Sequence, residues 1–141
     1  MKILILCTGN SCRSQMAHGF LQSFDNRLTV CSAGTDASGS LNAMAVKVMA
    51  DSGIDISSHT SDQVDKYLDE EWDYVITVCG GANESCPSFT GKVKHRLHMG
   101  FDDPSHTKGS EDYILSEFNR VRDEIKKQFH EFYINVLEPQ L

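Results

Sequence analysis

The residues of this 141-residue chain that are best placed to do chemistry lie in one short stretch near its start. Cys7 and Arg13 are separated by five small or polar residues, directly after the aliphatic run Ile3–Leu6. A strand, a tight loop and a helix start in this order point successive backbone N–H groups at one spot, where the helix dipole adds positive potential. Arg13 contributes a planar fork of donors that fits a tetrahedral oxyanion. The stretch therefore predicts an oxyanion site made of Cys7, Thr8, Gly9, Asn10, Ser11, Cys12, Arg13 and Ser14.

Cys7 is the predicted nucleophile of this site. It stands at the mouth of the loop, where backbone dipoles and Arg13 favour the thiolate over the thiol. Ser14 is placed to donate its hydroxyl to the same sulfur, which would favour the charged form further. The alternative is an inert buried cysteine beside a solvated arginine, and the combined pattern argues against it. No role follows for Cys12, whose simplest interpretation is a small packing residue.

Asp103 is the predicted general acid. It precedes Pro104, which fixes the local turn and biases the aspartate backbone toward an extended conformation. A carboxylic acid held near the bound anion can protonate a departing oxygen. An ordinary solvated turn is the alternative, and the neighbouring Asp102 competes for the same role.

Cys79 and Cys86 form a second candidate group. Six residues separate them, two of which are glycines, so the spacing is wider than the two to four residues usual between zinc ligands. His95 and His98 are a weak metal signal, and no metal is expected. A redox pair joined by a flexible segment is the favoured interpretation, and two unrelated packing thiols are the alternative. Cys31 is expected to be a small core residue.

Composition narrows the functional class. Thirteen Lys and Arg stand against twenty Asp and Glu, a net charge of −7, which argues against nucleic acid or an anionic membrane as partner. No signal peptide or membrane-length apolar run is visible, and five cysteines without such a signal are expected to stay reduced. We therefore expect a cytoplasmic, monomeric protein with one domain over residues 1–141.

The apolar patterns alternate between strands and helices. Strands are predicted at Ile3–Leu6, Leu28–Cys31, Tyr74–Val78 and, more weakly, Val93–Leu97; helices are predicted at 14–24, 42–49, 64–68 and from Ser110 onward. The segment Gly80–Pro87 is expected to be flexible. This alternation predicts an α/β fold whose parallel sheet has helices on both faces. Cys7 and Cys79 both end strands, so we expect them to meet at the carboxyl edge of that sheet.

With these residues in view, the chain resembles the thioredoxin-coupled arsenate reductases, which share their fold with the low-molecular-weight protein tyrosine phosphatases. The resemblance covers nearly the whole chain. Gln15 stands where the phosphatases usually have proline, and the pair of Cys79 and Cys86 matches the reductases. It implies a single catalytic domain of three layers, α/β/α, with a four-stranded parallel sheet in the order 2-1-3-4. The shared motifs are CTGNSCRSQMA from Cys7, SAG from Ser32, HTSD from His59, CP at Cys86, GFDDP from Gly100 and NRVRDEI from Asn119.

The resemblance also implies a reaction. Arsenate binds in the loop, Cys7 attacks arsenic and Asp103 protonates the departing oxygen. Cys79 then attacks Cys7 and arsenite leaves, after which Cys86 attacks Cys79 and thioredoxin reduces the resulting disulfide. No tightly bound cofactor is implied. Two other functions stay open: a phosphotyrosine-type phosphatase, which needs only Cys7, Arg13 and Asp103, and an inactive oxyanion-binding or redox-sensing module.

One departure from the family concerns a monovalent cation. Some family members hold potassium beside the loop through residues that match Asn10, Ser32, Thr60 and Asp62, helped by a glutamate. His18 stands at the position of that glutamate in this chain. Such a hard cation prefers oxygen ligands, so we expect weak or absent potassium binding.

Overall fold

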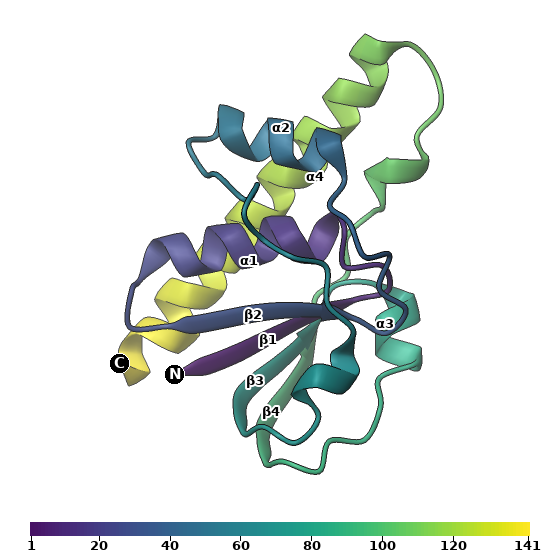
Figure 1. Ribbon diagram of the computed structural model, residues 1–141. Helices are drawn as coiled ribbons and strands as arrows, with labels where there is room; N and C mark the ends of the chain where they lie inside the picture. The colour runs from purple at the N-terminus through teal and green to yellow at the C-terminus, as the bar shows by residue number, and fades with distance from the viewer.

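Four parallel strands form a single sheet in the order β2-β1-β3-β4, in a computed structural model that describes residues 1–141 (Figure 1). The strands are β1 (Lys2–Cys7), β2 (Thr29–Gly34), β3 (Trp72–Thr77) and β4 (Val93–His98). Ile5 of β1 pairs with Ser32 on one side and Ile76 on the other. The predicted fold class and strand order are confirmed.

The position of each strand follows from its composition. β1 is central, and its residues Ile3–Leu6 are fully buried, as expected of a continuous aliphatic run. β4 lies at the edge, pairs only with β3 and is exposed along most of its length. Its charged side chains suit an edge strand, since charge discourages pairing with another chain, and they also explain why its apolar signal is weak.

Four α-helices surround this sheet: α1 (Arg13–Phe24), α2 (Ala43–Asp51), α3 (Gly80–Glu84) and α4 (Glu111–Phe132). Side chains satisfy the free N–H groups at the starts of α2 and α4. Asn42 accepts from Met44 and Ala45, and Ser110 accepts from Tyr113. Short 3₁₀ or π turns complete the chain at η1 (Val64–Tyr67), η2 (Pro104–His106), η3 (Tyr133–Leu137) and η4 (Glu138–Gln140). None of the helices combines the length and the apolar character needed to cross a membrane.

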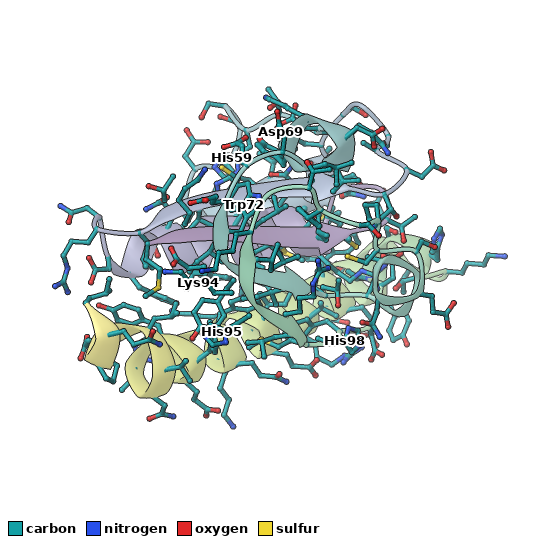
Figure 2. The ribbon with its side chains drawn as sticks, turned by 90° about the horizontal axis from the view of Figure 1, so that it is seen from below. His59, Asp69, Trp72, Lys94, His95 and His98 are labelled. Carbon is teal, nitrogen blue, oxygen red and sulfur yellow. The ribbon has the colours of Figure 1, made fainter.

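The two faces of the sheet are covered differently. On one face Ser32 of β2 contacts His18 of α1, and Tyr74 of β3 packs edge-on against Phe132 of α4. On the other face Cys31 contacts Tyr67 of η1. Figure 2 shows the segment around Asp69, which follows η1, and helix α4 on opposite sides of the strands. The second face therefore has a thin layer of short turns, whereas the first has the long helices.

Two predicted segments differ from the structure. Residues 80–84, which were expected to be flexible, form helix α3, because the Cys79 sulfur caps its first turn by accepting from the Ala82 N–H at 3.3 Å. β2 continues three residues beyond its predicted end and reaches the loop after β1. A Cβ at Gly34 would clash with the Thr8 carbonyl oxygen, so only glycine permits this close approach.

Candidate active site

The loop between β1 and α1 surrounds a cavity of about 270 Å³ at the carboxyl edge of the sheet. Asp103, 96 positions after Cys7 in the chain, closes one side of it. The whole predicted loop except Ser14 lines this cavity, so the sequence-predicted anion site and its predicted acid do come together. The lining residues are Cys7, Thr8, Gly9, Asn10, Ser11, Cys12, Arg13, Asp103, Ser105 and His106.

Asn10 holds the turn of the loop. It is fully buried and has a positive φ of 50°, a conformation that asparagine tolerates better than most residues. Its side-chain oxygen accepts from the Asp62 N–H at 2.9 Å, and its amide nitrogen donates to Ser14 Oγ at 2.8 Å. Its carbonyl accepts from Gln15 Nε2 at 3.0 Å. These bonds offset the cost of the left-handed backbone and set the shape of the cavity.

Ser14 therefore has a different partner from the one predicted. Its hydroxyl oxygen is engaged by Asn10, and no hydrogen bond joins it to Cys7. The loop was expected to activate Cys7 through Ser14, whereas the structure uses Ser14 to brace the loop itself. A serine side chain at the start of a helix readily bonds a neighbour within the same turn, and Asn10 lies four residues away.

Arg13 is held at the cavity wall by two contacts. Its Nη1 donates to the Phe101 carbonyl at 3.0 Å, and its Nη2 lies 3.4 Å from Asp103 Oδ2. The structure also separates the two neighbouring aspartates, because Asp102 points to solvent and pairs with Arg120 at 3.2 Å. Asp103, and not Asp102, is therefore the aspartate that borders the cavity.

Asp103 is a carboxylate when the site is free. Burial opposes its ionisation, but hydrogen bonds from Ser105 and the charges of Arg13 and His106 outweigh burial and lower its pKa. Ser105 donates to Oδ1 through both its N–H at 2.9 Å and its hydroxyl at 2.6 Å. Ser105 and His106 were not predicted as site residues, although their position just after Asp103 was a signal for them.

Cys79 reaches the same site from the end of β3. Its sulfur lies 3.4 Å from Oγ1 of Thr8, the residue that follows Cys7 in the loop, and all five cysteines are free. The neighbouring Cys7 thiol is the main cause that lowers the pKa of Cys79 to about 4, with help from Thr8 Oγ1 and from the Ala82 N–H at 3.3 Å. The neighbouring Cys79 and burial raise the pKa of Cys7.

The surroundings therefore favour the thiolate on Cys79, whereas the sequence predicted it on Cys7. The physical reason is the set of neighbours: Thr8 Oγ1 and the Ala82 N–H lie within hydrogen-bonding distance of the Cys79 sulfur, whereas the neighbouring Cys79 and burial raise the pKa of Cys7 more than the Arg13 charge and the Thr8 N–H lower it. The role of Cys7 as nucleophile stays a prediction. A Cβ at Gly81 would meet Thr8 Oγ1 at 2.8 Å, so the start of α3 packs tightly on the loop.

Cys86 lies away from this pair, beyond the end of α3. Arg96 of β4 donates to its sulfur at 3.7 Å and lies over the Phe89 ring at 5.3 Å. A cavity of about 360 Å³ adjoins Cys86 and Arg96. Arg96 was not singled out in the sequence, because Cys86 lies ten positions earlier and only the folding of the segment between α3 and β4 brings the two together.

The other candidate residues, Cys12, His95 and His98, contact neighbouring parts of the fold. Burial raises the pKa of Cys12 to about 12, so it stays a thiol in the cavity wall. His95 and His98 lie along β4, as Figure 2 shows. His95 stacks on Tyr74 at 4.8 Å, and His98 Nδ1 lies 2.8 Å from Thr77 Oγ1. Both histidines thus contact residues of the neighbouring strand β3.

The fold and the loop with its cysteine and arginine define a phosphatase-like class, and comparison with known proteins agrees. The model of the low molecular weight phosphotyrosine protein phosphatase family matches residues 2–140. The chain belongs to this family. A tyrosine phosphatase from Erwinia amylovora has the same fold, with a TM-score of 0.76 and 20% identity over 94% of this chain and 91% of its own.

Within the family, the chain is similar to proteins named arsenate reductase. It is 48% identical to that of Bacillus subtilis and 47% identical to that of Halalkalibacterium halodurans, in each case over 92% of this chain and 93% of the relative. A solved arsenate reductase in the phosphate-binding state superposes with a TM-score of 0.79 and 29% identity, over 96% of this chain and 98% of that one.

Proposed function

We propose that this protein is an arsenate reductase that uses Cys7, Cys79 and Cys86 in turn and is recycled by thioredoxin. The observation that carries the proposal is the position of a second cysteine at the anion loop: Cys79 Sγ lies 3.4 Å from Oγ1 of Thr8, the residue next to Cys7 in the cavity wall. Hydrolysis of a phosphate ester needs one nucleophile, and a second thiol beside it has no task there. Reduction of arsenic(V) to arsenic(III) needs two electrons, which two thiols supply when they become one disulfide. The similarity to proteins named arsenate reductase supports the same conclusion.

The first step joins Cys7 to arsenic. The oxyanion enters the cavity opposite Arg13, and the Cys7 proton passes to the adjacent Cys79 thiolate, so that Cys7 becomes the nucleophile. Cys7 sulfur bonds to arsenic and one oxygen leaves as water. Because Asp103 starts as a carboxylate, it first takes a proton from the arriving protonated arsenate. Asp103 then delivers this proton to the departing oxygen.

The second step carries the reduction. Cys79 sulfur attacks Cys7 sulfur, the electron pair of the sulfur–arsenic bond goes to arsenic, and the Cys79 proton goes to the departing arsenite. The sum is dihydrogen arsenate, the Cys7 thiol and the Cys79 thiolate giving hydrogen arsenite, water and a disulfide, so atoms, charge and electrons balance. Cys86 then attacks Cys79, frees Cys7 and leaves a disulfide near the surface for thioredoxin.

A phosphatase is the second candidate, because Cys7, Arg13 and Asp103 are also what ester hydrolysis needs and the family model carries that name. The cavity itself favours a bare oxyanion. None of its ten lining residues is Phe, Tyr or Trp, so no aromatic wall is present to hold a phosphotyrosine ring.

One experiment separates the two functions. Purified protein is mixed with arsenate, thioredoxin, thioredoxin reductase and NADPH, and NADPH loss is followed; a parallel sample receives p-nitrophenyl phosphate. We expect arsenate-dependent NADPH loss that Cys79→Ser abolishes. Fast ester hydrolysis that survives Cys79→Ser, with no arsenate-dependent NADPH loss, would show that the protein is a phosphatase.

A further inference from the structure

A partly buried polar cluster adjoins the anion loop, and apart from Asn10 its residues do not line the cavity. It joins α1 to β2 and to the segment before η1 through two histidines. The rings of His18 and His59 stack with their centroids 4.2 Å apart and their planes inclined by 24°. His18 Nδ1 lies 2.9 Å from Ser32 Oγ, and His59 Nδ1 lies 3.1 Å from Gln15 Oε1.

This cluster contains the residues that match the cation ligands of some family members. Asn10, Ser32, Thr60 and Asp62 are indeed brought together here. Their oxygens, however, already have donors from this chain. Gln15 Nε2 donates at 3.0 Å to the carbonyls of both Asn10 and Thr60, and so lies where a cation would bridge these two oxygens.

The side-chain oxygens are engaged as well. Asn10 Oδ1 accepts from the Asp62 N–H at 2.9 Å, and Ser32 Oγ contacts His18. Asp62 Oδ2 accepts from Thr60 Oγ1 at 2.9 Å, and Lys66 lies 3.9 Å from Oδ1. A potassium ion needs several free oxygens as ligands. Each oxygen of this cluster that bound potassium would lose an existing hydrogen bond.

His18 adds no charge to the cluster, in which Asp62 is the one acidic side chain. Burial and the neighbouring His59 lower the pKa of His18 to about 4, so its ring is neutral near pH 7. His18 Nδ1 also contacts Ser32 Oγ, which ties α1 to β2. A neutral ring in this position gives the cluster no negative charge to attract a cation, whereas a glutamate would add one.

We propose that the stacked pair of His18 and His59, acting with Gln15, replaces the monovalent cation in this protein and holds the anion loop in place without one. His18 is a positioning residue: it stacks on His59, which contacts Gln15, and Gln15 in turn donates to the Asn10 carbonyl in the loop. His18 does not line the cavity. This inference does not depend on which oxyanion the loop binds.

The test compares the native protein with His18→Glu and His18→Gln in potassium, sodium and choline chloride at one ionic strength. Melting temperature and hydrogen exchange of the amides of residues 8–13 are the readouts. For the native protein we expect both to be the same in all three salts. For His18→Glu we expect a saturable rise in melting temperature of roughly 5 °C in potassium, since a ligand that binds only the folded state stabilises it.

His18→Gln is the control, because it removes the ring stack without adding charge. Loop exchange in this variant should be about tenfold faster than in the native protein, since local opening is easier when the brace is lost, and potassium should not restore it. In His18→Glu potassium should restore native loop exchange.

A saturable, potassium-specific rise in melting temperature of the native protein would overturn the proposal, and this measurement requires no variant to fold. Loop exchange in His18→Gln equal to the native rate would show that His18 is not a positioning residue. A folded His18→Glu with no potassium response would show that the histidine is not what replaces the cation.

Discussion

At the scale of residues, the chemistry depends on which of two neighbouring cysteines, Cys7 or Cys79, is ionised. The Cys7 thiol, Thr8 Oγ1 and the Ala82 N–H lower the pKa of Cys79 to about 4 and so favour its thiolate. In the proposed reaction Cys7 keeps its proton until an oxyanion binds. The adjacent thiolate is then positioned to accept that proton, so the pair can form the nucleophile without help from solvent.

Thr8→Val tests this assignment. The change keeps the shape of the side chain and removes the hydroxyl that lies 3.4 Å from Cys79. Loss of one hydrogen bond to the charged form raises the pKa of Cys79 from about 4 by roughly one unit. At pH 5 its thiolate fraction, and therefore its alkylation by iodoacetamide, should fall about twofold. At pH 8 no change is expected, since the thiolate dominates in both proteins.

Ser11→Ala is the matched control for this experiment, because Ser11 also lines the loop but makes no side-chain hydrogen bond to either sulfur. Peptide mass mapping assigns the alkylated cysteine. An alkylation profile for Thr8→Val that overlays the native one at every pH would show that Thr8 does not set the charge of Cys79.

At the scale of elements, the short helix α3 separates the two cysteines that the proposed relay joins. Cys79 caps its start and Cys86 lies beyond its end. A rise of 1.5 Å per residue puts the two Cα atoms on the order of 10 Å apart, whereas a disulfide needs about 7 Å or less. Formation of that disulfide therefore requires α3 to unwind. A five-residue helix with two glycines permits this at low cost.

Cys86→Ser should stop the relay at a defined point. Without Cys86 the variant can reduce one equivalent of arsenate, after which Cys7 stays bonded to Cys79 and turnover with thioredoxin is slow, by about tenfold or more. Intact mass and peptide mapping after arsenate treatment detect that linkage. Turnover at the native rate would mean that Cys86 is only a packing residue.

Strand β4 gives Cys86 a charged neighbour in Arg96. A guanidinium beside a thiol attracts an anionic reagent more than a neutral one. The ratio of the rate with anionic iodoacetate to the rate with neutral iodoacetamide should therefore be higher for native Cys86 than for a free thiol. Arg96→Gln should lower this ratio about threefold, the size expected of an exposed charge. Salt at 1 M should lower the native ratio similarly, since it screens charges beyond about 3 Å.

Lys94→Gln is the control for Arg96, because Lys94 lies on the same strand and carries the same charge but pairs with Asp73 at 3.1 Å. Its ratio should stay native. If both variants lowered the ratio equally, the selectivity would come from the overall charge of the strand and not from Arg96.

At the scale of the whole molecule, helix α4 links the core to the site. Phe129 of α4 is fully buried and stacks on Phe101 with ring centroids 6.2 Å apart. The Phe101 carbonyl accepts from Arg13, and Asp103 follows two residues later. The position of the acid and the arginine therefore depends on packing between the long helix and the sheet.

Phe129→Ala should lower the free energy of unfolding by roughly 3–5 kcal/mol, the cost of a large cavity in a packed core. Phosphate affinity should fall as well, because the Phe101 turn loses its support. Urea unfolding and calorimetry measure the two effects. Ile134→Ala, whose side chain is 43% exposed, is the control and should change stability by less than about 0.5 kcal/mol. A Phe129→Ala protein as stable as this control would contradict the role given to α4.

The sequence alone was sufficient for the features that depend on neighbours along the chain. The aliphatic run before Cys7, the small residues up to Arg13 and the pattern after Ser110 specify a strand, a loop and a helix locally, and all three are present. The carboxyl ends of parallel strands share one edge, so the meeting of Cys7 and Cys79 was also predictable. The order of the four strands came from resemblance to a family, because local patterns do not encode which strands pair.

Only the tertiary structure decided how these groups act on each other. It assigned Asp103 and not Asp102 to Arg13, gave Ser14 a contact with Asn10 and not with Cys7, and brought Thr8 and the Ala82 N–H to the Cys79 sulfur, where they lower its pKa. Each outcome depends on atoms a few ångströms apart that belong to different elements or compete for one partner. The energies of hydrogen bonds and of charge pairs change steeply over such distances. The distances between elements are set by packing, and the spacing of residues along the chain does not determine them.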